Sequence, residues 1–302
     1  MKKIKIGIPR ALLYYRYGTL WKNYFEGLGC KIILSPETSQ EIMELGNKYT
    51  KEETCMSYKT YIGHILYLID KCDYILVSGI CNYGKNNKAC SKYKETYEYL
   101  KDKVLKESIL FYEVNHTAYK HEFFEFVKMG LKISKNIFKI IHSYIVAKQK
   151  QEIYDINKIN AAKNKITKLN KKILLLSHFY ILDDKYFSNY IIEYFKKNNI
   201  ITIKANSLDS KTATRFSEYF SGNIDIKYTK ELIGSLYYYK YQVDGIIYIS
   251  EAYCKIDSFI NNTIINRNKE IPIINILIDE NISKESIERQ LLTFTNTIKA
   301  NK

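Results

Sequence analysis

Residues 2–34 of the chain read KKIKIGIPRALLYYRYGTLWKNYFEGLGCKIIL, and this stretch decides the fold. The apolar run that ends at Pro9 predicts a first strand, and residues 12–28 carry apolar side chains at helical spacing. Gly29 is a typical helix stop, and the β-branched run over residues 30–34 predicts a second strand. A strand, a helix and a strand in this order form the seed of a parallel sheet.

The same alternation continues along the rest of the chain. Further strands are predicted over residues 73–77, 108–114, 172–177, 200–204, 243–250 and 271–278. Further helices are predicted over residues 35–46, 56–71, 184–198, 229–241, 257–268 and 283–299. Residues 117–170 carry no strand pattern, and their lysine-rich apolar spacing predicts one or two long helices.

This order predicts an α/β protein made of two doubly wound, mostly parallel-sheet half-domains of Rossmann or flavodoxin type, joined by long helices. The expected domains are residues 1–116, a helical connector over 117–170, and residues 171–302. Ligands of such sheets bind at the carboxyl ends of the strands. The loops over residues 78–92, 177–184 and 251–258 are therefore the expected site.

The chain has 302 residues and is basic, with 47 Lys and Arg against 32 Asp and Glu, a formal net charge of +15. Such a charge can attract nucleic acid, an anionic cofactor or an acidic partner. The lysines are scattered along the whole chain, and no zinc-finger, helix-turn-helix or RNA-binding signature occurs. We therefore do not expect direct nucleic-acid binding.

The first residues do not read as a secretory signal, because Gly7, Pro9 and Arg10 interrupt the apolar run. No uninterrupted apolar run of about 18 residues occurs, so no membrane span is expected. We expect a cytoplasmic protein whose six cysteines are reduced thiols or metal ligands. Cys30 and Cys72 border predicted strands and are interpreted as core residues.

Several segments carry a family resemblance. They are IGIPRAL (residues 6–12), ETC (53–55), KACSK (88–92), KILLLSHFY (172–180), VDGIIY (243–248) with Cys254 after it, and the closing Asp279-Glu280 pair. In this order they resemble the iron–sulfur component of the 2-hydroxyacyl-CoA dehydratase family. The first segment, residues 6–12, resembles the activase-associated domain that is found with these dehydratases. The resemblance covers nearly the whole chain.

The resemblance implies a 4Fe-4S cluster, single or part of a double-cubane cluster, held by Cys55, Cys90 and Cys254. Three thiolates leave one iron open to a further ligand. The implied partners are an ATP-dependent activase that delivers a low-potential electron, an acyl-CoA or small-molecule substrate, and a second subunit in a homo- or heterodimer. The implied activity is a radical dehydration, as in a lyase, or a cluster-dependent reduction.

The sequence departs from the family pattern beside each of these cysteines. Met56 and Ser91 stand where proline is common, and Tyr253 and Lys255 stand where glycine is usual. An alternative is therefore a non-catalytic paralogue that acts as a scaffold or regulator of an activase–dehydratase system. Cys81 has no counterpart in the motifs and is a candidate fourth ligand or a spare thiol.

Two further side chains are candidate catalytic residues. His178 follows a predicted strand and can contact substrate or the cluster edge, or only stabilise its loop. Lys59, one turn after Cys55, can bind a phosphate or a cluster sulfide, or be an exposed helix lysine. Asp257 is interpreted as a helix N-cap, and His64 as a half-buried structural residue. No phosphate-binding loop of ATPases occurs, so ATP hydrolysis by this chain is not expected, and the resemblance implies that it stands on the electron-receiving side.

Overall fold

The computed structural model describes residues 3–84, 86–100, 108–220, 222–280 and 282–300. The chain forms two compact units. The N-terminal unit comprises Met1–Thr50, Tyr58–Ile156 and Ile224–Lys227. The C-terminal unit comprises Lys51–Ser57, Asn157–Asn223 and Tyr228–Lys302. A short segment from the first half of the sequence therefore belongs to the C-terminal unit.

The first half of the chain contains four strands and the helices between and after them. These elements are β1 (Lys5–Ile8), α1 (Tyr14–Gly27), β2 (Lys31–Leu34), α2 (Gln40–Lys48), α3 (Met56–Leu68), β3 (Tyr74–Ser78), α4 (Lys92–Leu100), β4 (Ile109–Tyr112), η2 (His116–Ala118), α5 (Glu122–Leu131) and α6 (Ile137–Ile166). Ser39 caps α2, its side chain accepting a hydrogen bond from the Ile42 backbone N–H.

The second half repeats this alternation of strands and helices. Its elements are β5 (Lys172–Leu176), α7 (Phe179–Asp183), α8 (Lys185–Lys197), β6 (Ile201–Lys204), η3 (Ala205–Ser207), α9 (Ser210–Phe216), η4 (Ser217–Tyr219), α10 (Lys227–Tyr239), β7 (Gly245–Glu251), α11 (Lys255–Arg267), β8 (Ile273–Ile278) and α12 (Lys284–Ala300). Aspartates cap two of these helices, Asp184 at α8 and Asp209 at α9.

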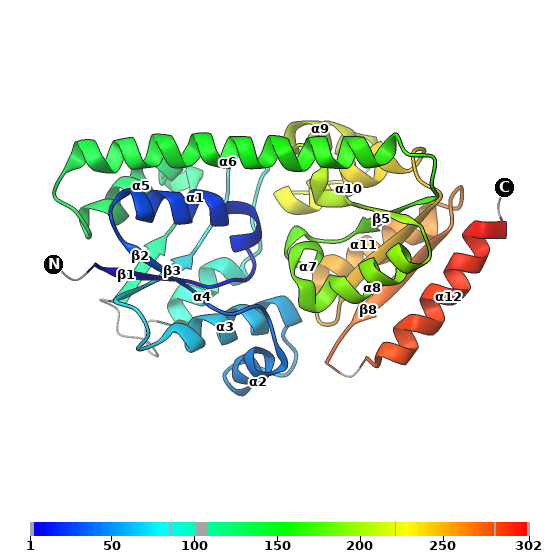
Figure 1. Cartoon of the computed structure of the whole chain (residues 1–302), viewed down its shortest axis with the longest axis horizontal. Coiled ribbons are helices and arrows are strands. Elements are labelled where there is room, and N and C mark those ends of the chain that lie inside the picture. Colours follow the sequence, from blue (N-terminus) through cyan, green and yellow to red (C-terminus); the bar gives the residue numbers. More distant parts are fainter. Residues whose placement is uncertain (1–2, 85, 101–107, 221, 281, 301–302) are drawn as a thin grey trace. The chain divides into compact units, whose positions relative to one another are not determined.

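Both sheets have four strands and the same topology. The strand order is β2-β1-β3-β4 in one unit and β6-β5-β7-β8 in the other, and every pairing is parallel. In the first sheet the chain moves from β1 to β2 and then back across β1 to β3. Right-handed connections therefore put α1 and α3 on opposite faces, as Figure 1 shows. The predicted α/β class with two parallel, doubly wound sheets is confirmed.

The central strands of the second sheet are fully buried, which is why they read as apolar runs. All seven residues of β7 are buried, and in β5 the four residues from Ile173 to Leu176 are inaccessible to solvent. Each buried leucine or isoleucine contributes about 1.5–3 kcal/mol to folding. Glu251 is the last residue of β7. Because the whole strand is buried, the carboxylate of Glu251 also lies in this apolar interior.

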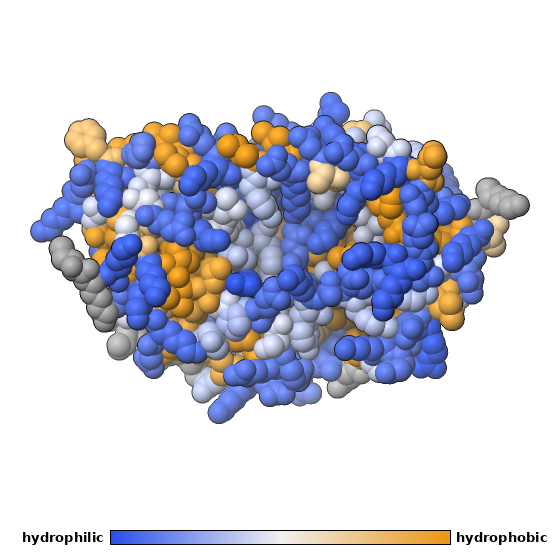
Figure 2. Space-filling view, in the orientation of Figure 1, coloured by the Kyte–Doolittle hydropathy of each residue, from blue (hydrophilic) through white to orange (hydrophobic). Residues whose placement is uncertain are grey.

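The exposed face drawn in Figure 2 is mostly hydrophilic, and apolar groups reach the surface along α6. Phe138, Ile145 and Ile153 are exposed on this helix. Within the described parts of the chain, no helix combines the length and the apolar character needed to cross a membrane.

The sequence did not predict three helices, and it placed one helix start incorrectly. The first two, α4 and α9, are short and polar, and α7 occupies the segment that was expected to be a loop before α8. The interpretation of Asp257 as an N-cap is wrong, because α11 begins at Lys255 and Asp257 lies in its first turn. Its carboxylate reaches back to the backbone of Glu251, so the helix can begin two residues earlier.

Candidate functional site

The second sheet reverses its strand order between β5 and β7, and polar side chains gather where these two strands end. His178 follows β5 after Ser177, and Glu251 ends β7. The Ser177 hydroxyl donates to the Ile249 carbonyl at 2.6 Å and ties the ends of both strands together. A switch point of this kind is where open α/β sheets bind their ligands.

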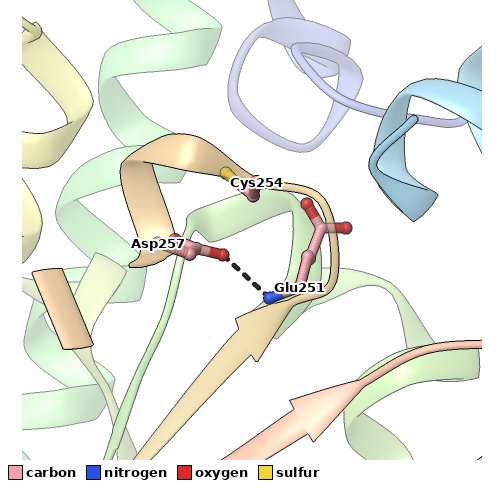
Figure 3. A group of neighbouring side chains, drawn as sticks. All are labelled: Glu251, Cys254 and Asp257. Atoms are coloured by element: carbon pink, nitrogen blue, oxygen red, sulfur yellow. Dashed lines mark hydrogen bonds between the residues drawn. The ribbon is translucent and has the colours of Figure 1, made fainter. Parts of the chain in front are cut away.

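The turn between β7 and α11 brings three potential metal ligands together (Figure 3). Glu251, Cys254 and Asp257 each offer one ligand atom, and these atoms lie within 4.8 Å of one another. Tyr253, inside the turn, has φ of 60°, in the left-handed region that favours glycine. The turn thus keeps a backbone conformation suited to glycine although tyrosine stands there.

Asp257 is the buried anchor of this turn. Its Oδ2 accepts a hydrogen bond from the Glu251 backbone N–H at 2.9 Å, and its Oδ1 accepts one from the Tyr248 hydroxyl at 3.0 Å. The same Oδ1 lies 3.1 Å from His178 Nε2, within ion-pair distance, although the ring N–H is not aligned for a hydrogen bond. Both carboxylate oxygens are therefore already engaged by the protein.

Glu251 is held on one side only. Its Oε1 accepts hydrogen bonds from the Ser57 backbone N–H at 2.8 Å and from the Ser57 hydroxyl at 2.5 Å. Among the described residues, Oε2 has no hydrogen-bond partner, although only 2% of the residue is exposed. Burial, and then the neighbouring Asp257, raise the pKa of Glu251 to about 7.

Cys254 directly precedes α11 and lies beside both acids. Burial raises the pKa of its thiol far above the usual range, and Asp257 and Glu251 add to this effect by repelling a thiolate. A metal cation would reverse this balance, because it offsets the negative charge and deprotonates a thiol that it binds. The arrangement disfavours a bare thiolate and favours one bound to a cation.

Cys55 belongs to the same unit and directly precedes α3. Glu251, which ends the strand before the turn of Cys254, accepts hydrogen bonds from Ser57, so the segment that carries Cys55 lies beside this turn. Ser57, two residues on, carries the hydrogen bonds to Glu251 that fix this segment against the turn after β7. Two of the three predicted cluster ligands, Cys55 and Cys254, thus lie in one unit, each at the N-terminus of a helix.

His178 is 4% exposed and stacks on Tyr180 with ring centroids 5.1 Å apart. Burial acts to lower its pKa, but Asp257 and Glu251 outweigh burial and the pKa is raised. The imidazole is therefore poised to be the cationic partner of Asp257. Whether it also contacts a substrate stays a prediction.

The other predicted site residues belong to the N-terminal unit. Cys90 lies two residues before α4, and the Ala89 backbone N–H donates to the Cys81 carbonyl at 2.9 Å, which closes the loop between these cysteines. That Cys90 is a cluster ligand, and Cys81 a fourth ligand or a spare thiol, stays a prediction. All six cysteines lie in described segments, and none of them forms a disulfide.

Two interpretations of residues in α3 are corrected by their burial. Lys59 is 4% exposed, so the reading as an exposed helix lysine is wrong; its catalytic role stays a prediction. His64 is fully buried rather than half-buried, and its Nε2 lies 3.0 Å from Thr38 Oγ1. Burial, reinforced by Arg10, lowers the pKa of His64 to about 3.

Sequence reasoning did not single out Glu251 and assigned Asp257 only a capping role. One signal could have found them. Both acids flank Cys254 at a spacing of three residues, directly after an uninterrupted apolar strand. A strand that is buried along its whole length carries its last residue into the interior, whatever the polarity of that residue.

Comparisons with known proteins give one family and no functional relative. Residues 5–208 match the model of a family described as "CoA enzyme activase uncharacterised domain" (DUF2229). No curated protein matches the sequence.

Two solved structures are similar over nearly the whole chain, but only weakly. They are a Zn(II)-bound AdcAII variant of Streptococcus pneumoniae, with 11% identity over 100% of both chains and a TM-score of 0.32, and the SBP FpvC of Pseudomonas aeruginosa with Ni2+, with 10% identity over 99% of this chain and 97% of that chain and a TM-score of 0.27. Likeness of this extent implies neither a shared ligand nor a shared function.

Proposed function

We propose, from the premise that the chain belongs to the CoA enzyme activase uncharacterised domain family (DUF2229), that it is the metal-centre component of an activase system. In this proposal the chain holds a 4Fe-4S cluster and accepts a low-potential electron from an ATP-dependent activase. The electron serves the dehydration or reduction of a CoA thioester or another small substrate.

One observation carries the proposal. Cys55 and Cys254 are far apart in the sequence, yet they lie in one unit, where Ser57 donates to Glu251 and joins their segments, and each cysteine directly precedes a helix. A helix N-terminus favours negative charge, and at Cys254 it would act together with the bound iron against the repulsion from the two acids. Cys90, just before α4 in the other unit, is the proposed third ligand.

The residues around Cys254 fit a positively charged centre. Two carboxylates lie beside the thiol, and one buried carboxylate oxygen of Glu251 has no partner within the described chain. An iron–sulfur core carries positive charge that thiolates and carboxylates compensate. Negative groups close to such a core also make its reduction harder, which agrees with the need for an ATP-driven electron donor.

The side chains have distinct proposed roles. Cys55, Cys90 and Cys254 would hold the cluster, which would supply one-electron reduction to a bound substrate. Asp257 fixes the turn that presents Cys254, and His178 supplies the compensating positive charge beside Asp257. Cys81, in the loop that leads to Cys90, stays a candidate ligand.

A second candidate function is a non-catalytic scaffold or regulator of an activase. The observation in its favour is the high pKa of the Cys254 thiol, because a protonated thiol beside two acids is unreactive when no metal is present. This candidate requires that the turn after β7 has a structural role only.

The two candidates differ in iron content. The whole chain is purified and reconstituted without oxygen, and iron and acid-labile sulfide are measured per chain. The cluster proposal expects iron and sulfide in equal amounts, with loss of most of both in Cys55→Ser, Cys90→Ser and Cys254→Ser. Cys72→Ser is the matched control, since this cysteine is also partly buried but donates only to the Leu68 carbonyl.

An iron-free wild-type chain after reconstitution would refute the cluster proposal and favour the scaffold. Iron that stays bound in both Cys55→Ser and Cys254→Ser, as it does in Cys72→Ser, would refute the ligand set. Addition of the activase with ATP should then reduce the iron of the wild type and of Cys72→Ser only.

A further inference from the structure

We infer that Glu251 is itself a ligand of the metal centre, binding iron through its Oε2 atom. The inference rests on the function proposed above and adds an oxygen ligand that neither the motifs nor the family supply. It assigns to Glu251 the position that three cysteine thiolates leave open on one iron.

The first argument is geometric. The ligand atoms of Glu251 and Cys254 lie within 4.8 Å of each other, close enough for one metal centre to contact both side chains. Figure 3 shows the carboxylate and the thiol on the same turn, joined through the backbone between β7 and α11. No movement of secondary structure is needed to bring the two groups to a common centre.

The two carboxylate oxygens of Glu251 differ in their hydrogen bonding. Oε1 accepts two hydrogen bonds from Ser57, and Oε2 accepts none from the described residues, although Glu251 is 2% exposed. A buried polar atom without a partner costs about 1–3 kcal/mol, and more when it is charged. A bound cation removes this cost, whereas hydrogen bonding to Oε1 fixes the direction in which Oε2 points.

The third argument separates Glu251 from its neighbour. Asp257 engages both of its oxygens with the protein, through Tyr248 and His178 at Oδ1 and the Glu251 N–H at Oδ2. It therefore positions the turn, and Glu251 is the carboxylate with an oxygen to spare. The structure thus divides the two acids into one ligand and one positioning residue.

The test is 57Fe Mössbauer spectroscopy and cyanide binding on the anaerobically reconstituted full chain. In the wild type one iron should differ from the other three, because it carries an oxygen ligand in place of a thiolate. Cyanide competes with Glu251 for this iron, so cyanide affinity, followed by EPR of the reduced protein, should rise about tenfold or more in Glu251→Gln.

Two controls keep the result interpretable. Glu251→Asp shortens the side chain by one methylene and should also raise cyanide affinity, while retaining the charge. Glu231→Gln removes a glutamate that bonds the Ser210 hydroxyl elsewhere in the same unit and should leave cyanide affinity unchanged.

The outcomes distinguish this inference from the proposed function. A wild type without iron overturns both. A wild type with a full cluster whose four irons are equivalent, or whose cyanide affinity equals that of Glu251→Gln, overturns the ligand role of Glu251 alone. The Mössbauer result needs no variant, so four equivalent irons would overturn the ligand role even if Glu251→Gln does not fold.

Discussion

Each unit contains one buried histidine, and the two are in opposite charge environments. His64, in the N-terminal unit, faces Thr38 and Arg10, and burial with Arg10 lowers its pKa to about 3. His178, in the C-terminal unit, faces Asp257 and Glu251, and these acids raise its pKa despite burial. The first imidazole is a neutral structural group, whereas the second can carry a charge.

The difference shows that burial alone does not identify a site. Both rings are inaccessible or nearly so, and what differs is the sign of the charge packed against them. In the C-terminal unit the acids also surround a thiol, and together they form a group of metal-ligand type. Clusters of mutually perturbed titratable groups mark functional sites more often than isolated buried ones do.

The largest expected effect comes from removing the anchor of the acidic cluster. Asp257→Ala leaves the Glu251 N–H without its acceptor, removes one of the two acceptors of the Tyr248 hydroxyl, and takes from His178 its acidic partner. Breaking a buried charge pair costs about 3–5 kcal/mol, so the free energy of unfolding should fall by that amount. Urea denaturation of the metal-free protein measures it.

Asp209→Ala is the matched control, because this aspartate only caps α9 through the Thr212 N–H. Loss of a cap costs about 1 kcal/mol. Equal losses in the two variants would mean that Asp257 is no more than a helix-start residue.

The second effect concerns the hydroxyl that holds Glu251. Ser57→Ala removes one of two hydrogen bonds to Oε1 and should cost about 1.5–3 kcal/mol if the acceptor is charged. Because this bond lowers the pKa of Glu251, the pKa should rise above about 7 in the variant. The infrared band of the protonated carboxyl, followed against pH, reports the shift.

Ser250→Ala is the neutral counterpart, since its hydroxyl donates to the amide oxygen of Asn275 at 2.8 Å. It should cost about 0.5–1.5 kcal/mol and leave the infrared titration unchanged. A Ser57→Ala titration that matches the wild type would show that Ser57 does not control Glu251.

The third effect concerns the pH dependence of stability, which should differ between the two histidines. His64 binds a proton at 6.5 in the unfolded chain and only near 3 in the folded chain, so stability is lost as pH falls below 6.5. At about pH 5 the loss is about 2 kcal/mol, and His64→Gln should remove it. Denaturation curves across this pH range measure the difference.

His178 has the opposite sign. Its folded pKa is raised, so its contribution to stability is complete below 6.5 and is lost as pH rises through the folded value. His178→Gln should remove this dependence on the alkaline side. NMR of the imidazole rings checks the difference in pKa between His64 and His178. This difference would be contradicted if both rings were neutral at about pH 6.5.

The smallest effect lies in the backbone of the acidic turn. Tyr253 is exposed and has φ of 60°, which costs a side-chain-bearing residue about 1–2 kcal/mol. Tyr253→Gly removes this strain but gives the unfolded chain more conformational freedom. The net effect should be a stabilisation of the protein by about 0.5–1 kcal/mol. Thermal denaturation measures this gain.

Asn199→Gly is its control, because Asn199 has φ of 58° and asparagine tolerates this region better than tyrosine does. Its gain should be smaller. A loss of stability in Tyr253→Gly would show that the tyrosine ring makes contacts that outweigh the strain.

The sequence predicted every strand and most helices, because both sheets are built from apolar runs that end at glycine or polar residues. It did not predict α4 and α9, whose short polar segments form helices through tertiary contacts and, in α9, through the Asp209 cap. It identified Cys55 and Cys254 through their motifs. Glu251 was missed because the residue that bonds its carboxylate, Ser57, is far away in the sequence, and periodicity does not reveal such a contact.

The central claim is that thiolates of Cys55 and Cys254, together with a carboxylate, bind iron in the C-terminal unit. X-ray absorption at the iron edge, on the anaerobically reconstituted chain, tests it most directly. We expect a mostly sulfur coordination shell that is lost in Cys254→Ser and retained in Cys72→Ser. A shell of oxygen and nitrogen only, unchanged in Cys254→Ser, would contradict it.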